Sequence, residues 1–219
     1  MVLLWHGRGP DERDVLAPLA RATASLGIVC FVPDWRSDAQ DGGRTHLRES
    51  ASYVQQHAAD FGGDTGRIVL AGWSLGSKAA VAAALAPCAL DGWRPRAVVG
   101  IAGGHTGPQP LTGRTPIEEA AGIAESVPAI PVWLIHGSAD PVVDVQQSRL
   151  LYAALRHRGW PTSLHEPDTD HAGVIMTEYD PEYGRCRPCR AEHALLGGRQ
   201  TVQLLARAAD MTPGCQPVM

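Results

Sequence analysis

A serine stands between two glycines in the run Gly72-Trp73-Ser74-Leu75-Gly76. The short apolar run Arg67–Ala71 before it is typical of a buried strand, and Leu75–Ala86 after it has helical spacing. A strand-to-helix turn lifts the hydroxyl above the sheet and places it at a helix N-terminus, where negative charge is favoured. We therefore predict that Ser74 is a nucleophile. The alternative is a tight turn with an unreactive serine.

A serine is a weak nucleophile unless a base activates it, and that base needs an orienting acid. In this arrangement the acid follows the serine along the chain, and a histidine follows the acid. Asp140 comes shortly after the apolar run Pro131–Ile135 and is the expected acid. Asp144 is expected in the first turn of the next helix, where an acidic side chain is favourable in any case. The alternative for Asp140 is a helix-capping role.

Two histidines compete for the role of base. His165 lies inside the apolar run Thr162–His165 and is expected to be a packed or edge residue. His171 lies in the following loop and can reach back over the sheet, so it is the predicted base. Asp170 is its chain neighbour, and adjacent side chains diverge. Structural or surface roles are expected for the other histidines considered, His136, His157 and His193.

Two backbone amides are expected to bind an oxyanion. One is the N–H of Leu75, directly after the serine, and the other is the N–H of Arg8 in the run His6-Gly7-Arg8-Gly9. The spacing of Gly7 and Gly9 also fits the start of a dinucleotide-binding fingerprint. That reading fails because Glu12 stands where the third glycine is required.

The sequence resembles the α/β-hydrolase superfamily, near the small single-domain esterases of the dienelactone-hydrolase-like type. The resemblance rests on four motifs in the right order: His6-Gly7-Arg8-Gly9, Gly72-Trp73-Ser74-Leu75-Gly76, His136-Gly137-Ser138-Ala139-Asp140-Pro141-Val142-Val143 and Asp170-His171. They extend over almost the whole chain. The resemblance implies a carboxylesterase-like serine hydrolase with a Ser-Asp-His catalytic triad, and it does not identify the substrate.

The chain departs from this family in two ways. The family usually has two strands before the one that carries His6-Gly7, so the N-terminal strands are expected to be missing, through a minimal fold or a late start. Dienelactone hydrolases proper use a cysteine nucleophile, whereas position 74 is serine. Their lactone specificity is therefore not expected here.

Short apolar runs alternate with helical segments along the chain, which predicts an α/β fold with a mostly parallel central sheet of about six strands and helices on both faces. The predicted strands are Val2–Trp5, Gly27–Val32, Arg67–Ala71, Ala97–Ala102, Pro131–Ile135 and Thr162–His165. The predicted helices are Asp11–Leu26, Thr45–Phe61, Leu75–Ala86, Val145–His157 and Ala191–Ala209.

One α/β-hydrolase domain is expected over residues 1–210. Within it, residues 103–128 form an excursion over the active site with one helix at Pro116–Ala124. The tail, residues 211–219, is expected to be loose.

Ligands of an open parallel sheet bind at the carboxyl ends of its strands. Trp35, Trp73 and His105 follow strands at this edge and are expected to contact substrate, although tryptophans also pack between sheet and helices. Arg36 and Thr106 are expected beside them at the mouth of the site. Arg36 is expected to pair locally with Asp34 or Asp38 rather than with a substrate.

Cys186 and Cys189, with His193, resemble part of a zinc-site spacing, for which Cys215 could be the fourth ligand. A redox or disulfide pair is a second possibility. Unreactive thiols are the favoured interpretation, and no metal or organic cofactor is expected.

The composition limits the function classes. The 219 residues are 44% hydrophobic and 19% charged, with a formal net charge of −4, which argues against a nucleic-acid binder. No apolar run approaches the roughly 20 residues that cross a bilayer, and the N-terminus does not resemble a signal peptide. Five cysteines do not form a disulfide framework. A cytoplasmic location is expected.

The sequence thus predicts a serine hydrolase that cleaves a small carboxylic ester or thioester through an acyl-enzyme on Ser74. Two alternatives remain: an acyltransferase or peptidase with the same triad, and a catalytically silent binding protein of the same fold. The oligomeric state is not predicted.

Overall fold

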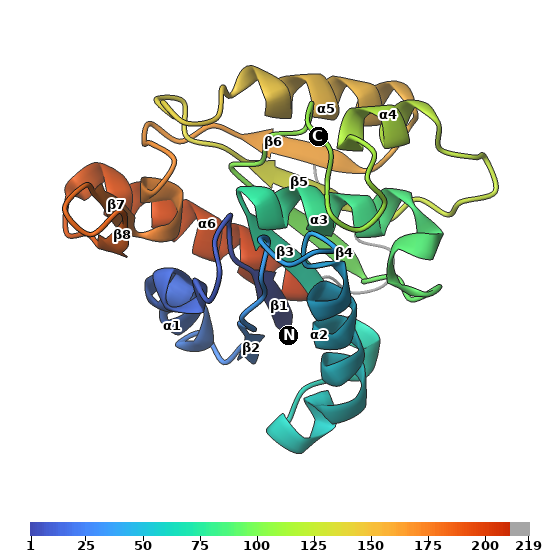
Figure 1. Cartoon of the computed structure of the whole chain (residues 1–219), viewed down its shortest axis with the longest axis horizontal. Coiled ribbons are helices and arrows are strands. Elements are labelled where there is room, and N and C mark those ends of the chain that lie inside the picture. The colour runs from blue at the N-terminus through green and yellow to red at the C-terminus, as the bar shows by residue number, and fades with distance from the viewer. Residues whose placement is uncertain (211–219) are drawn as a thin grey trace.

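Six parallel strands form the central sheet of the computed structural model, which describes residues 1–210 (Figure 1). The spatial order is β2-β1-β3-β4-β5-β6. The strands are β1 (Val2–Trp5), β2 (Cys30–Phe31), β3 (Val69–Trp73), β4 (Ala97–Ile101), β5 (Val132–Ile135) and β6 (Thr162–His165). The predicted fold class is confirmed, and the strand order reverses between β1 and β3, where ligands bind in open α/β sheets.

Helices cover both faces of this sheet. They are α1 (Ala17–Ala24), α2 (Arg44–His57), α3 (Leu75–Leu85), α4 (Pro116–Ala121), α5 (Gln146–His157) and α6 (Glu192–Asp210). Short 3₁₀ turns occupy Arg13–Leu16, Ala58–Phe61, Thr65–Arg67, Pro87–Leu90 and Gly173–Ile175. Residues of α2, α3, α4 and α5 belong to one apolar core, and residues of α1 and α6 belong to the other.

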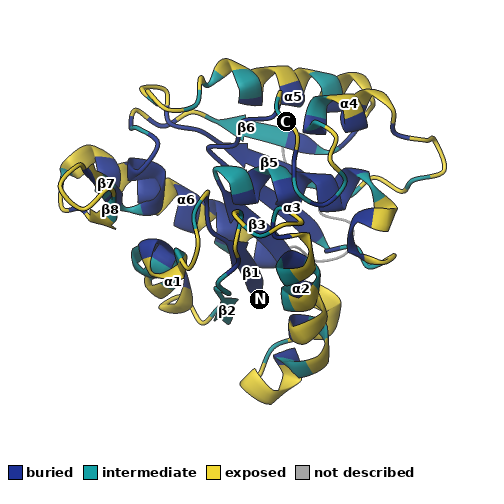
Figure 2. Cartoon of the chain, viewed as in Figure 1, coloured by how far each residue is buried: buried dark blue, intermediate teal, exposed yellow. Residues whose placement is uncertain are grey.

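Successive strand residues point to opposite faces, so the inner strands β1, β3, β4 and β5 contribute to both cores. In β1, Leu3 and Trp5 join the core under α2 and α3, whereas Val2 and Leu4 join the core under α1 and α6. Figure 2 shows the inner strands β1, β3, β4 and β5 buried, the edge strands β2 and β6 largely intermediate, and exposed residues on the outer helix surfaces. This double burial explains why the strands read as continuous apolar runs.

The alanine-rich helix α3 is buried against the sheet rather than exposed. Ala79, Ala80 and Ala83 are at most 1% exposed. Small side chains allow close approach to the strands, and a Cβ at Gly100 in β4 would lie 2.9 Å from the Ser77 hydroxyl oxygen of α3. Across residues 1–210, no helix combines the length and apolar character needed to span a bilayer.

The structure differs from the expected elements in several places. The predicted helix Asp11–Leu26 is a 3₁₀ turn followed by the shorter α1, and the predicted helix Thr45–Phe61 ends as α2 at His57. The edge strand β2 has only two residues, because it has one neighbour and Pro33 follows closely without an N–H donor. An unpredicted antiparallel hairpin, β7 (Thr177–Asp180) and β8 (Arg185–Pro188), precedes α6. Helix α4 ends at Ala121, before Gly122. The tail, residues 211–219, and with it Cys215, lies outside the described residues.

Candidate active site

Ser74 lies on a strained turn between β3 and α3, with φ 55° and ψ −114°. Its N–H donates to the Ile101 carbonyl at 2.8 Å. The two flanking positions have room only for glycine. A Cβ at Gly72 would lie 2.2 Å from the Gly76 oxygen, and one at Gly76 would lie 2.4 Å from the His6 oxygen. A non-glycine residue held at positive φ is a feature that clusters at functional sites.

Asp140 and His171 are hydrogen-bonded to each other. The His171 Nδ1 atom lies 2.7 Å from Asp140 Oδ2, and the Asp140 side chain is fully buried. The Val142 and Val143 amides donate to Asp140 Oδ1 at 2.8 and 2.9 Å. These bonds fix the carboxylate, which in turn orients the imidazole ring.

A second histidine, His136 at the end of β5, contacts the same carboxylate. Its Nε2 atom lies 3.1 Å from Asp140 Oδ2 and 2.8 Å from the Val143 carbonyl. Since both neighbours are acceptors, Nε2 carries a proton, and Nδ1 can accept from the Ser148 hydroxyl at 2.7 Å. Burial opposes ionisation of Asp140, but hydrogen bonds from the two histidines outweigh it and hold its pKa well below the ordinary value.

His171 packs against the residue that precedes the serine. The Trp73 Nε1 donates to the His171 carbonyl at 2.9 Å, and the two rings lie 5.1 Å apart. His171 is 8% exposed. The loop after β6 is therefore attached directly to the turn that carries Ser74.

The competing candidates occupy other positions. Asp144 is exposed, and its carboxylate accepts from the Gln146 amide at the start of α5. His165 is half-buried in β6 beside Ser163. Asp170 accepts from the Ala172 and Gly173 amides and so stabilises the turn after His171.

The loop after β1 packs directly onto this turn. A Cβ at Gly7 would lie 2.9 Å from the Trp73 ring and 3.3 Å from the Ser74 Cβ. His6 holds the loop: its Nδ1 lies 3.0 Å from the Gly7 carbonyl, and its Nε2 accepts from the Trp35 N–H. Burial lowers the pKa of His6.

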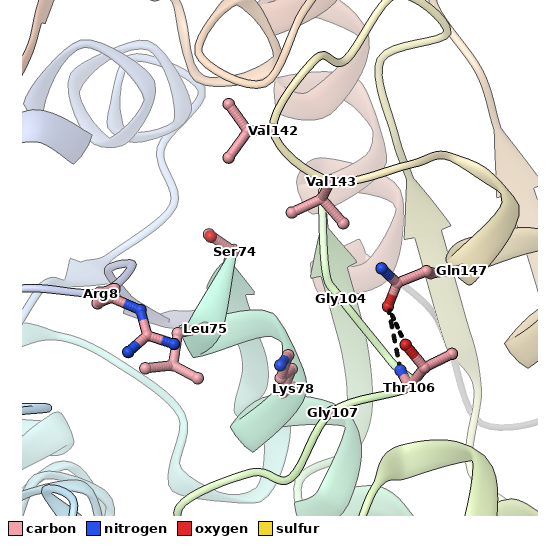
Figure 3. A pocket seen from close by; sticks show the side chains of 10 residues that line it. All are labelled: Arg8, Ser74, Leu75, Lys78, Gly104, Thr106, Gly107, Val142, Val143 and Gln147. Atoms are coloured by element: carbon pink, nitrogen blue, oxygen red, sulfur yellow. Dashed lines mark hydrogen bonds between the residues drawn. The ribbon is translucent and has the colours of Figure 1, made fainter.

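A pocket of about 310 Å³ opens beside the serine. Arg8, Ser74 and Leu75 line it together, as do Lys78, Gly104, Thr106, Gly107, Val142, Val143 and Gln147 (Figure 3). Leu75 is the first residue of α3, so its N–H has no intrahelical partner. The start of the 103–128 segment thus borders the pocket, and its helix α4 packs against α3 and α5.

The three predicted substrate-contacting side chains are not among the residues that line this pocket. Trp35 is 1% exposed, stacks on His6 and donates from Nε1 to the His6 carbonyl, so it supports the loop from behind. Trp73 is 6% exposed and is engaged by His171. His105 is fully buried, and among the described residues neither ring nitrogen has a hydrogen-bond partner. All three side chains are buried in the interior, which for the two tryptophans is the alternative that the sequence left open.

Two weaker predictions can be compared with the structure. Arg36 forms the expected local pair with Asp38 at 2.9 Å. Cys186 and Cys189 are free thiols, and Cys189 Sγ lies 3.2 Å from Glu178 Oε2. Within residues 1–210, no group of three or more His, Cys, Asp or Glu side chains is arranged so that it could hold a metal ion.

Sequence reasoning missed three residues of the site. His136 was given a structural role, although it stands four residues before Asp140 in the same motif. Lys78 was not singled out, although it is the only lysine in the chain and lies one helical turn after Ser74. Gln147 gave no sequence signal.

These features together define the α/β-hydrolase fold: a parallel sheet with a serine on the turn after β3 and an acid and a histidine after later strands. No family model matches the sequence. A thermophilic esterase from the planctomycete Thermogutta terrifontis superposes with a TM-score of 0.71 at 18% identity, covering 98% of this chain and 84% of that one.

Two further proteins are similar to this chain. A Klebsiella pneumoniae protein assigned to the dienelactone hydrolases gives a TM-score of 0.67 at 18% identity over 96% of this chain and 86% of its own. The esterase LipQ of Mycobacterium tuberculosis is 25% identical over 195 residues, 74% of this chain. The matched region spans about half of that relative, 46% of its length.

Proposed function

We propose that this chain is a serine hydrolase of the carboxylesterase type that cleaves a small ester or thioester. The observation that carries the proposal is the buried Asp140–His171 hydrogen bond beside the strained turn of Ser74. A carboxylate bonded to Nδ1 leaves Nε2 of His171 as the proton acceptor, which is the arrangement that activates a serine hydroxyl.

In the proposed reaction Ser74 Oγ attacks the acyl carbonyl while His171 takes the hydroxyl proton. Collapse of the tetrahedral intermediate breaks the bond to the leaving group, which receives that proton from His171. Water, deprotonated by the same imidazole, then attacks the acyl carbonyl. The bond from Ser74 Oγ to the acyl group breaks, His171 returns its proton to Oγ, and the acid is released. Asp140 stabilises the imidazolium formed in each half-reaction.

The oxyanion would be held by the backbone N–H groups of Leu75 and Arg8. Both residues line the pocket with Ser74, and the Leu75 amide lies at the positive end of α3. Loss of one such donor typically costs about 2.7–4 kcal/mol of barrier. Gly7 permits this loop to approach the serine closely.

The solved relatives support a small acyl group. The Thermogutta esterase has been solved with propionate and with butyrate bound, and phosphorylated by paraoxon. A pocket of about 310 Å³ in this chain fits substrates of that size. We therefore propose a small-molecule ester, rather than a polymer, as its partner.

Hydrolysis of short-chain aryl esters and thioesters tests the proposal. We expect turnover by the wild type and a loss of at least about 10⁴-fold in Ser74→Ala. Ser52→Ala, which changes an exposed serine on α2, is the matched control and should retain full activity. Equal rates for the wild type and Ser74→Ala would contradict the proposal.

A further inference from the structure

The pocket beside Ser74 has an unusual charge distribution. Arg8 and Lys78 line it, and none of the lining residues drawn from the described chain is acidic. Among residues 1–210, neither cation has an ion-pair or hydrogen-bond partner, whereas Arg13, Arg36, Arg149 and Arg187 all pair with acids. Two unpaired cations at one pocket repel each other unless an anion joins them.

Lys78 is held at the pocket by its surroundings. It lies one turn after Ser74 on α3, and a Cβ at Gly107 would lie 2.9 Å from Lys78 Nζ. A Cβ at Gly104 would lie 3.3 Å from Lys78 Cε. The two glycines therefore leave room for the ammonium group beside the chain segment that borders the pocket.

Gln147 adds a third donor. Its Oε1 atom accepts from both the Thr106 amide and the Thr106 hydroxyl, at 3.1 and 2.8 Å. These bonds fix the side-chain amide, so the Nε2 group remains to donate. Figure 3 shows Arg8 and Gln147 at opposite ends of the pocket with Lys78 between them.

We propose that this pocket is an anion subsite. The substrate is then a small ester that also carries a free, negatively charged carboxylate, such as a monoester of a short dicarboxylic acid. The inference rests on the proposed function, since the reacting ester would lie at Ser74. The carboxylate is recognised by Lys78, which lies between Arg8 and the Gln147 amide, and the positive charge of Arg8 adds to the attraction. Burial, with the nearby Arg8 charge, lowers the pKa of Lys78, and a bound anion offsets both effects.

The test compares charged esters with neutral esters of the same shape. On the acyl side, the pair is monoethyl glutarate and ethyl glutaramate. On the alcohol side, it is 3-(butyryloxy)propionate and its primary amide. For one of these pairs we expect the wild type to favour the charged ester by about tenfold or more in kcat/KM, because hydrogen bonds to charged groups are among the stronger ones.

Lys78→Met should lower this charged-to-neutral ratio by about tenfold, and Lys78→Arg should retain most of it. Arg156→Met, which removes an exposed cation of α5 outside the pocket, should leave the ratio unchanged. A wild-type ratio of one or less for both pairs, or a ratio unaltered in Lys78→Met, would overturn the proposal.

Binding without turnover separates this inference from the proposed function. Calorimetry on Ser74→Ala should show monomethyl glutarate binding more tightly than methyl glutaramate, and Lys78→Met should remove the difference. If no ester is hydrolysed but the anion preference is present, the proposed function fails and the subsite stands. If esters are hydrolysed but neither the rates nor the binding favour the charged ester, the anion-subsite proposal is wrong and the proposed function stands.

Discussion

His136 Nε2 lies 3.1 Å from Asp140 Oδ2, the same oxygen that His171 Nδ1 contacts at 2.7 Å. One carboxylate oxygen thus receives two imidazole N–H groups in a site closed to solvent. The first bond orients the proposed base, and the second holds the carboxylate from behind. We therefore infer that His136 is a positioning residue.

Removing that second bond should slow catalysis without changing substrate affinity. His136→Leu should lower kcat by about 10- to 100-fold with little change in KM, because a hydrogen bond to a charged group contributes about 1.5–3 kcal/mol. His136→Gln, which can still donate to Asp140, should recover much of the loss. A higher KM with an unchanged kcat would contradict a positioning role.

Asp140→Asn should lower kcat by about 10⁴-fold, since an amide stabilises the wrong tautomer of His171 and cannot balance the imidazolium. Asp144→Asn is the paired control, because Asp144 is exposed and contacts only the start of α5. Steady-state kinetics on both variants measures the difference. Similar losses in the two would show that Asp140 has no special role.

The buried His105 should make stability depend on pH. Burial lowers its pKa from 6.5 to about 3, and the nearby Lys78 charge acts in the same direction. The unfolded chain therefore takes up a proton below pH 6.5 while the folded protein does not. The free energy of unfolding should fall by about 1.4 kcal/mol per pH unit from this group, down to about pH 3.

Urea unfolding of the wild type and His105→Leu at several pH values checks this. The variant should lose the part of the slope that His105 contributes between pH 6.5 and 3. His193→Leu removes an exposed imidazole and should keep the wild-type slope. Parallel curves for the wild type and His105→Leu would contradict the assignment.

Gly76→Ala should destabilise the fold as well as the site. The new Cβ would meet the His6 oxygen at 2.4 Å and the Trp5 oxygen at 2.5 Å, both of them backbone atoms that cannot move alone. Overpacking of this kind costs about 1–3 kcal/mol. Thermal unfolding should show a lower Tm, and an unchanged Tm would mean that α3 can shift away from β1.

The sequence was informative wherever local pattern determines structure. Buried parallel strands require continuous apolar runs, so β1, β3, β4, β5 and β6 were predicted within about two residues. The hairpin β7–β8 was missed because its strands are polar and short. The order of the strands and the face of the sheet that each helix covers depend on long-range packing, and a single sequence contains no direct signal for it.

At the candidate site, motif residues were easier to predict than their surroundings. Ser74 stands in a pattern whose glycines are required by backbone contacts. By contrast, Trp35 and His105 follow strands at the correct edge but are buried, because their side chains turn inward. Whether a residue at a strand end faces the pocket depends on side-chain direction, which spacing does not encode.

Covalent labelling by a fluorophosphonate probe, read by intact mass on the wild type and Ser74→Ala, tests directly whether Ser74 is an activated nucleophile. We expect one adduct on the wild type and none on the variant, because only a serine activated by His171 reacts readily. A folded wild type that forms no adduct, or an adduct that persists in Ser74→Ala, would contradict an activated Ser74.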